Sequence, residues 1–180
     1  INTLKAVDAS DRQYADFDLV YKGNMTKWVK YANSLLLRIA IRMSDVDETN
    51  AKAYAQFAIA NGVITENADN AMLETQDNSV FKVAVSWNDS RAGADIVAYM
   101  NAFSDPRREV YFTEVAGLPQ KYIGLRSGAP AITIDPAKFS APKLTKESPM
   151  VWITAAEVAF IKAEMALKGW GFVGDTAENL

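Results

Sequence analysis

The sequence contains no cysteine and no histidine among its 180 residues. The missing cysteines exclude disulfide bonds, thiol nucleophiles and thiolate metal sites. The missing histidines exclude Ser-His-Asp and Cys-His catalysis, and they remove the commonest metal ligand. Chemistry based on carboxylate pairs, on lysine or on oxygen-ligated cations stays open.

Strong charge of either sign is also missing, since 19 basic and 22 acidic residues leave a net charge of −3. Binding to nucleic acid or to an anionic membrane surface needs a basic face, so neither partner is indicated. No apolar run reaches the roughly 18 residues of a membrane span, and no signal segment begins the chain. We interpret residues 1–180 as a single-domain piece of a longer protein, whose signal peptide or lipid anchor would lie outside it.

The stretch WVKYANSLLLRIAIRM, from Trp28 to Met43, predicts a helix that is apolar on two sides. One face holds Trp28, Ala32, Leu35, Ile39 and Met43, and the second holds Leu36, Leu37, Ala40 and Ile41. A helix in a stack of helical hairpins needs two such faces, because it has a neighbour on each side. We expect Asn24 or Thr26 to cap this helix.

The same helix carries Arg38 and Arg42 one turn apart, on a shared face. We expect these arginines to border solvent or to pair with Asp45 or Asp47. The alternative is that they contact a ligand or a partner.

Four further helices are expected along the chain. One runs from about Ala51 to Ala60 and ends at Asn61-Gly62, which completes a hairpin over about residues 24–62. A short helix in AGADIVAYMNAF ends at Asp105-Pro106. A late helix in PMVWITAAEVAFIKAEMALKGWG has Pro149 near its start, and DTAENL then opens another helix capped by Asp175 or Thr176. A second hairpin would therefore begin at about residue 150 and be truncated.

Between these helices the chain is rich in proline, with five of its six prolines at residues 107–149. This density predicts a loop-rich region over about residues 104–149 with short strands, and such tracts are often functional. The stretch SVFKVAVSW, with its spaced Val80 and Val85, is typical of a strand or an extended segment. The fold class is therefore mostly α, with helical hairpins and a proline-rich insertion.

Four stretches of the sequence resemble motifs of the SusD/RagB-like family, in the family's order. YKGNMTKWVKYANSLLLRIAIRMSDVD resembles a segment reading Y-x-G-D, K-W and A-N-S-L-x-L-R-x-A-x-R, with Asn24 in place of the commoner aspartate. Its matching positions are Tyr21, Gly23, Lys27, Trp28, Ala32, Asn33, Ser34, Leu35, Leu37, Arg38, Ala40 and Arg42. The other three motifs are carried by Asp105, Pro106 and Arg107 (D-P-R), by Tyr122 and Gly124 (Y-x-G), and by Glu157, Ala163, Glu164 and Gly169 in the late helix.

The likeness is closest to the branch called SusD-like family two, without its N-terminal lipoprotein cysteine and its C-terminal end. It implies tetratricopeptide-like hairpins that support a loop-rich region. It also implies a lipid-anchored protein on the outer-membrane surface of a Bacteroidetes bacterium. Such proteins are not enzymes and need no cofactor. They bind glycans, or sometimes peptides, and deliver them to a TonB-dependent transporter.

Glycan binding needs flat aromatic rings beside planar polar side chains. Trp87 is followed by a polar run that includes Asn88 and Arg91, while Tyr122 and Arg126 lie in the proline-rich region. These five residues are the candidate ligand-binding residues. The alternative is that Trp87 anchors its loop to the core and that Tyr122 is a packing residue. Trp28 and Trp152 are expected in helices and in the core, and Trp170 is left open.

Other chemistry has weak support in the sequence. DVDETN lacks the glycine and the final glutamate of a calcium loop, so no metal site is expected. No P-loop or dinucleotide motif occurs. Two rival functions stay open: a helical-repeat adaptor that binds only another protein, and a glycoside hydrolase, whose paired carboxylates are a spatial arrangement that a sequence does not show.

Overall fold

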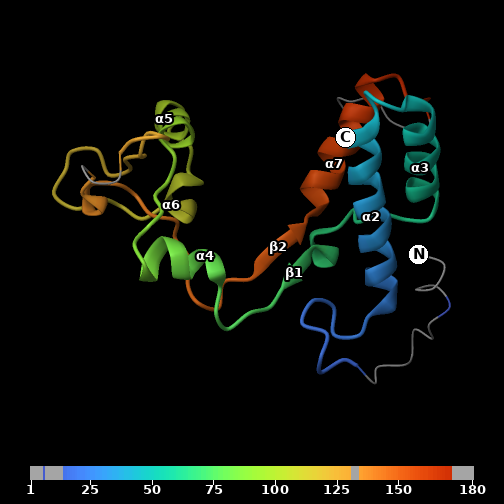
Figure 1. Cartoon of the computed structure of the whole chain (residues 1–180), viewed down its shortest axis with the longest axis horizontal. Helices are drawn as coiled ribbons and strands as arrows, with labels where there is room; N and C mark the ends of the chain where they lie inside the picture. The colour runs from blue at the N-terminus through green and yellow to red at the C-terminus, as the bar shows by residue number, and fades with distance from the viewer. Residues whose placement is uncertain (1–5, 7–13, 131–133, 172–180) are drawn as a thin grey trace. The chain divides into compact units, whose positions relative to one another are not determined.

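A computed structural model describes residue 6, residues 14–130 and residues 134–171. The chain divides into two compact units (Figure 1): residues 1–74 with 150–180 form unit 1, and residues 75–149 form unit 2. The described residues are mostly helical, with one small sheet, as the fold class predicted. That the two units act as one domain stays a prediction.

Unit 1 is built around the long helix α2 (Met25–Met43). Its other elements are α3 (Glu48–Ala60), the 3₁₀ turn η1 (Asn67–Asp69), β1 (Ala71–Leu73), β2 (Met150–Ile153) and α7 (Ala155–Leu167). α2 packs against both α3 and α7 (Figure 1), which confirms that it needs two apolar faces. Fully buried Leu37 and Ala40 of α2 belong to the same core cluster as Ala55 of α3 and Met165 of α7.

Local capping explains where two of these helices begin. Asn24 caps α2 as expected, since its side-chain oxygen accepts a hydrogen bond from the backbone N–H of Lys27 at 3.1 Å. The next helix starts earlier than predicted, at Glu48, because Asp47 caps it in the same way through the N–H of Asn50. The predicted stop of that helix is confirmed, since Asn61 is its C-cap.

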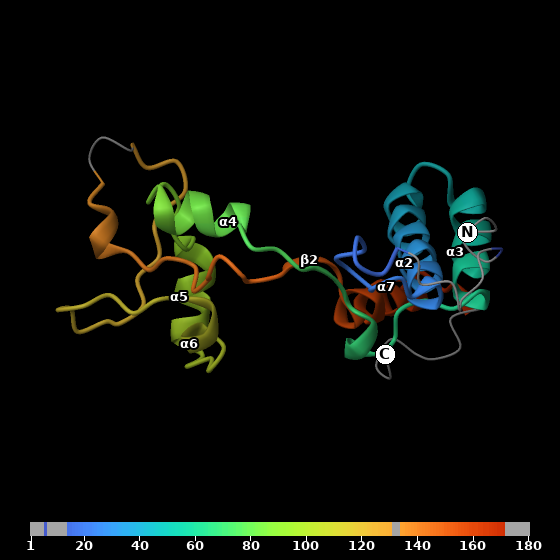
Figure 2. The same cartoon turned by 90° about the horizontal axis from the view of Figure 1, so that it is seen from below.

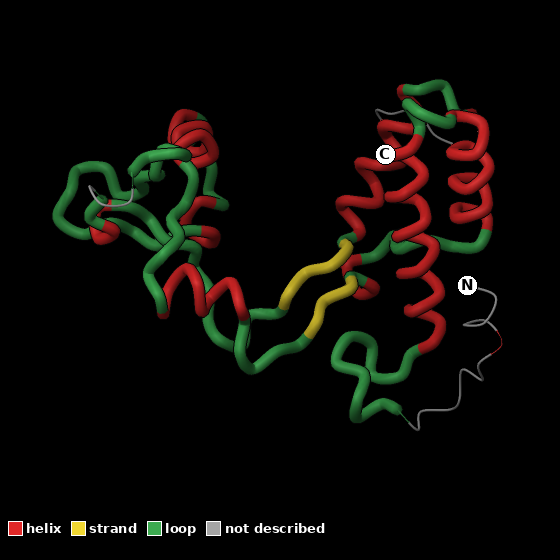
Figure 3. The backbone as a smooth tube through the Cα atoms, viewed as in Figure 1, coloured by secondary structure: helices red, strands yellow, loops and turns green. Residues whose placement is uncertain are grey.

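The late helix begins later than predicted. Residues 150–153 form β2, which pairs antiparallel with β1 (Figure 3), so the prediction of a helix there was wrong. Trp152 consequently lies on a strand with 38% of its surface exposed, and its assignment to a core helix was also wrong. Trp170 is buried, and its indole N–H donates to Glu48. The helix expected after Asp175 or Thr176 lies outside the described residues.

Unit 2 consists of short helices joined by long loops (Figure 2). Its elements are α4 (Ser79–Phe81), the π-helical turn η2 (Lys82–Ser86), α5 (Ala94–Ala102), α6 (Arg108–Tyr111) and the 3₁₀ turn η4 (Pro136–Lys138). The short helix α5 was expected. The strand or extended segment expected over residues 79–87 is instead helical over residues 79–86, because the side chain of Asn78 caps α4 by accepting from the N–H groups of Val80 and Phe81. Within the described residues, no helix is long and apolar enough to cross a membrane.

Gly124 of the Y-x-G motif lies close against the backbone at the start of α5. A Cβ at this position would lie 2.6 Å from Cα of Ala94. The approach allows a parallel bridge between Gly93 and Leu125, with Leu125 N–H donating to Ala92 O at 2.7 Å. A side chain is therefore excluded here by sterics, which explains this glycine.

Candidate functional site

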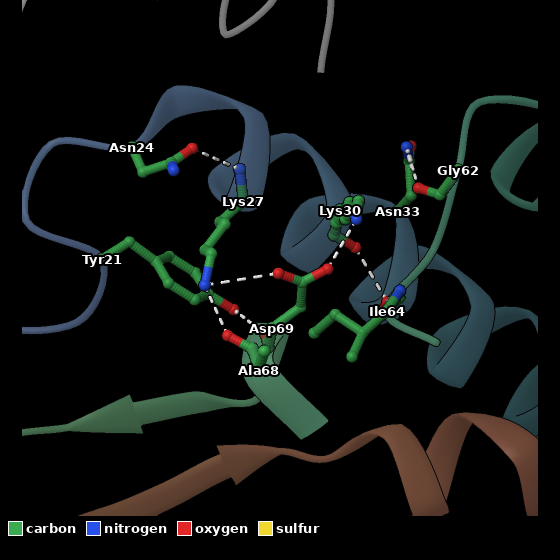
Figure 4. Close-up of polar contacts among 10 residues, drawn as sticks. Tyr21, Asn24, Lys27, Lys30, Asn33, Gly62, Ile64, Ala68 and Asp69 are labelled. Atoms are coloured by element: carbon green, nitrogen blue, oxygen red, sulfur yellow. Dashed lines mark hydrogen bonds and ion pairs between the residues drawn. The ribbon is translucent and has the colours of Figure 1, made fainter. Parts of the chain in front are cut away.

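The buried polar residues of α2 serve the backbone of the turn after α3 (Figure 4). Asn33 donates from Nδ2 to the carbonyl oxygens of Asn61 and Gly62, at 2.9 and 2.7 Å, and Figure 4 shows the second of these bonds. Ser34 accepts the backbone N–H of Ile64 at 2.9 Å. Both side chains are fully buried. They satisfy backbone groups that would otherwise lack partners, so their role is structural.

A second polar cluster fixes η1 to the start of α2 (Figure 4). The carboxylate of Asp69 forms ion pairs with Lys30 at 2.5 Å and with Lys27 at 3.3 Å. The hydrogen bond from Lys30 is the main cause that lowers the pKa of Asp69. The Tyr21 hydroxyl donates to the carbonyl oxygen of Asp69, and burial, with the nearby charge of Asp69, raises the pKa of Tyr21 to about 12. These contacts are internal to unit 1.

The two arginines of α2 differ in their surroundings. Arg38 donates to both carboxylate oxygens of Glu157 on α7, at 2.6 and 2.7 Å, and also to the carbonyl oxygen of Trp152. The predicted pairing with Asp45 or Asp47 was therefore wrong for Arg38, because Asp45 pairs with Lys168 and Asp47 caps α3. Arg42 is exposed, as expected for a residue bordering solvent.

The loop after η2 carries Trp87, the most exposed tryptophan among the described residues, with 59% of its surface accessible. Its backbone N–H bonds to the carbonyl of Lys82, which closes the π-helical turn. The Lys82 ammonium lies 5.8 Å from the centroid of the indole ring. Asn88 follows in the left-handed region, with φ of 62°. Non-glycine residues rarely adopt this conformation, and they do so disproportionately at functional sites.

Arg91 lies at the end of this loop and is held by backbone carbonyls. Its Nε donates to Pro136 O at 2.8 Å, and its Nη1 donates to Ser90 O at 2.7 Å and to Ala84 O at 3.3 Å. Its Nη2 donates to the side-chain oxygen of Asn88. The structure therefore joins two of the five candidates, Asn88 and Arg91, by hydrogen bonds, and Trp87 directly precedes Asn88 in the same loop.

The other two candidates lie elsewhere in unit 2. Tyr122 is 5% exposed, packs in a small cluster with Ala92 and Val97, and donates from its hydroxyl to Glu114 at 3.3 Å. Burial is the main cause that raises the pKa of Tyr122. Arg126 is exposed in a turn. Ligand contact by either residue stays a prediction, and the surroundings of Tyr122 are those of a packing residue.

Sequence reasoning missed the groups that surround Trp87. Lys82 is one π-helical turn before the tryptophan, and no sequence pattern signals a π-helical turn here. The carbonyl of Pro136 is 45 residues from Arg91, so only the fold brings the two together.

Metal ligation has no support among the residues whose placement is described, where no group of three or more acidic side chains is arranged to hold an ion. The segment DVDETN places its carboxylates in other contacts, since Asp45 pairs with Lys168 and Asp47 bonds to Asn50.

Comparison with known families identifies the scaffold. The family model described as SusD and RagB outer membrane lipoproteins matches residues 1–180. The chain belongs to the SusD/RagB family. This confirms the family predicted from the motifs, and the family's description agrees with the expected place at the outer membrane.

Solved structures of SusD homologues are similar over nearly the whole chain. One from Bacteroides thetaiotaomicron is 36% identical with a TM-score of 0.92, and the match covers 99% of this chain and 39% of that one. One from Bacteroides uniformis is 38% identical with a TM-score of 0.88, again covering 99% and 39%. A chitin-binding SusD homologue from Flavobacterium johnsoniae is 33% identical with a TM-score of 0.83, covering 94% and 36%.

The chain thus spans about two fifths of the length of these SusD homologues. No curated protein matches the chain.

Proposed function

We propose that the protein captures oligosaccharides at the bacterial surface and delivers them to a TonB-dependent outer-membrane transporter, without acting on them as an enzyme. The observation that carries the proposal is the exposed indole of Trp87, presented beside a polar loop. Membership of the SusD/RagB family and the chitin-binding relative support it.

The chemistry of the Trp87 loop suits a sugar. An exposed indole offers a broad apolar face, on which the C–H groups of a pyranose ring can lie. Asp89 and Ser90 of the same loop are exposed and half-buried polar residues, and Asn88 keeps its amide nitrogen free of any protein contact that the structure shows. These groups can bond hydroxyls around the edge of a stacked ring. Arg126 is a further exposed candidate, while Tyr122 would support the surface by packing.

Substitution of Trp87 tests the proposal directly. The intact protein is first screened against a panel of soluble glycans by affinity electrophoresis, with chitin oligosaccharides included. For each glycan bound, isothermal titration then compares the wild type with Trp87→Ala and with Phe103→Ala, whose exposed aromatic ring lies on the same unit. We expect Trp87→Ala to weaken binding by about tenfold or more, as truncation of an aromatic anchor does, and Phe103→Ala to leave it unchanged.

Two results would overturn this assignment. Absence of binding to every glycan in the panel would reject the ligand class, and peptide cargo would then be tested. Full retention of glycan binding by Trp87→Ala would reject the site. Delivery is tested separately, by co-purification of the intact protein with a TonB-dependent transporter from the same organism.

The groove between α2 and α7 gives little support to the alternative that the protein is a glycoside hydrolase. Asp45, Glu157 and Glu164 line this groove, but Glu157 is held by Arg38 and Asp45 by Lys168. The lysine contact lowers the pKa of Asp45, which disfavours a general acid. Release of reducing ends from a bound glycan would reverse this conclusion.

A protein-binding adaptor is the other alternative. Ile96, Tyr99 and Phe103 form an exposed apolar stripe at helical spacing along α5. Loss of transporter co-purification, but not of glycan binding, after Tyr99→Ser would assign this stripe to protein contact.

A further inference from the structure

We infer that Arg91 is a positioning residue, which holds Trp87 in its exposed orientation and does not itself contact the ligand. The inference rests on the proposed function for its biological meaning, but it concerns a property of the free protein. It also gives Arg91 a different role from Trp87 and Asn88, although the sequence analysis predicted all three as ligand contacts.

The contacts of Arg91 nearly exhaust its hydrogen-bonding capacity. A guanidinium carries five N–H donors and no acceptor. Its Nε donates to Pro136 O and its Nη2 donates to Asn88 Oδ1, while the two N–H groups of Nη1 face three backbone carbonyls, Ala84 O, Asn88 O and Ser90 O. The contact with Asn88 O, at 3.5 Å, is the longest of the five. Four of the five N–H groups therefore already face protein acceptors, which leaves one N–H of Nη2 without an acceptor that the structure shows.

The location of these acceptors explains how Arg91 acts on Trp87. The last carbonyl groups of a helix lack partners within the helix, and basic side chains often supply one. In η2, Lys82 O accepts from the N–H of Trp87 at 2.9 Å, and Val83 O accepts from the N–H of Asp89 at 3.1 Å. Ala84 O accepts from Arg91 at 3.3 Å. Arg91 thus continues the hydrogen-bond pattern at the end of the turn that carries Trp87.

The same side chain also bonds to the residue that follows the tryptophan. Asn88 has a φ of 62°, a left-handed conformation that asparagine adopts more readily than other residues with a Cβ but that is still uncommon outside glycine. Arg91 bonds to both the carbonyl and the side chain of Asn88, and it ties them to Pro136 of η4. The indole is 59% exposed, and the ring contact that the structure shows is the Lys82 ammonium at 5.8 Å. We therefore expect its orientation to depend on the loop backbone that Arg91 holds.

The test uses the intact protein labelled with 5-fluorotryptophan, in which the ¹⁹F resonance of Trp87 is assigned by its loss in Trp87→Phe. The test variant is Arg91→Lys, because a lysine keeps the charge but cannot bond a planar set of carbonyls. Arg107→Lys is the matched control, since Arg107 is an exposed arginine of the same unit whose side chain bonds to Asp105. Arg91→Met is the second variant, in case the lysine finds new partners.

We expect Arg91→Lys and Arg91→Met to shift and broaden the Trp87 resonance, while the other tryptophan resonances and the control variant stay as in the wild type. Affinity for a glycan that needs Trp87 should fall by roughly tenfold in Arg91→Lys. An unchanged Trp87 resonance in both Arg91 variants would overturn the inference, whatever happens to glycan affinity. The ¹⁹F result is obtained without ligand, so failure of glycan binding would reject the proposed function and leave this test intact.

Discussion

Replacement of Ser34 by alanine should lower the free energy of unfolding of unit 1, because it leaves a buried backbone N–H group without a hydrogen-bond partner. The Ser34 hydroxyl accepts the backbone N–H of Ile64, and both residues are fully buried. In Ser34→Ala the N–H of Ile64 loses its partner in a place that water does not reach. A buried donor left unpaired costs about 1–3 kcal/mol.

The same substitution at Ser44 provides a matched control on the same segment. Ser44 is also buried, but its hydroxyl donates to the carbonyl oxygen of Ile41, which already accepts the backbone N–H of Ser44. Ser44→Ala therefore leaves no backbone group without a partner. We expect a free-energy cost of about 2 kcal/mol for Ser34→Ala and about 0.5 kcal/mol for Ser44→Ala.

Two measurements on the intact protein check this difference. Denaturant-induced unfolding gives the change in the free energy of unfolding, and hydrogen exchange followed by mass spectrometry reports the protection of the amide of Ile64. In Ser34→Ala this amide should exchange faster than in the wild type. Equal costs for the two alanine variants, with the amide of Ile64 still protected, would refute the reasoning that α2 is polar here to satisfy the backbone after α3.

Three further outcomes follow from the contacts described. Gly124→Ala should lower the stability of unit 2 by about 2 kcal/mol or more, because its Cβ would lie 2.6 Å from a backbone Cα of α5. Gly93→Ala is the control and should be nearly neutral, because a Cβ there meets open space. Thermal unfolding measures both variants. A double-mutant cycle of Arg38→Met and Glu157→Gln should give a coupling of about 1 kcal/mol; additive effects would contradict the ion pair. The folded-state pKa of Asp69 lies below the usual 3.8, so its contribution to stability is present above that pH and is lost as the pH falls through the folded value. Asp69→Asn should flatten the decline in stability as the pH falls below the usual 3.8 of an aspartate, and an unchanged decline would contradict it.

The parts of the fold that depend on local chemistry were predictable. The N-cap of α2 at Asn24, the stop of α3 at Asn61 and the position of α5 follow from residues within a few positions of each element. The two apolar faces of α2 likewise follow from helical spacing, and both are used.

The parts that depend on distant partners were not predictable. β2 forms because β1 pairs with it, and Ala71 and Ile153, which are opposite each other, are 82 positions apart in the sequence (153 − 71). Arg38 pairs with Glu157, which is 119 positions away in the sequence. The prediction of a nearby partner such as Asp45 was wrong for this reason. The spacing of the valines before Trp87 predicted a strand, but this segment is helical and Asn78 caps its first turn.

In the candidate site, too, the features that depend on local residues were predictable and those that depend on distant groups were not. The tryptophan with a polar run after it was visible in the sequence, and the structure shows that Trp87 is exposed and that Asn88 and Arg91 are hydrogen-bonded. The carbonyl oxygens that surround Arg91 belong to the backbone, so no residue type marks them. For this reason sequence reasoning listed Arg91 as a ligand contact, while the geometry supports a positioning role.

The most direct test of the account is a titration of the 5-fluorotryptophan-labelled intact protein with a glycan that it binds, followed by the ¹⁹F resonance of Trp87. The account predicts that this resonance moves as the site fills, with a midpoint that matches the affinity from calorimetry. A Trp87 resonance that stays unchanged when the protein is saturated with glycan would contradict it.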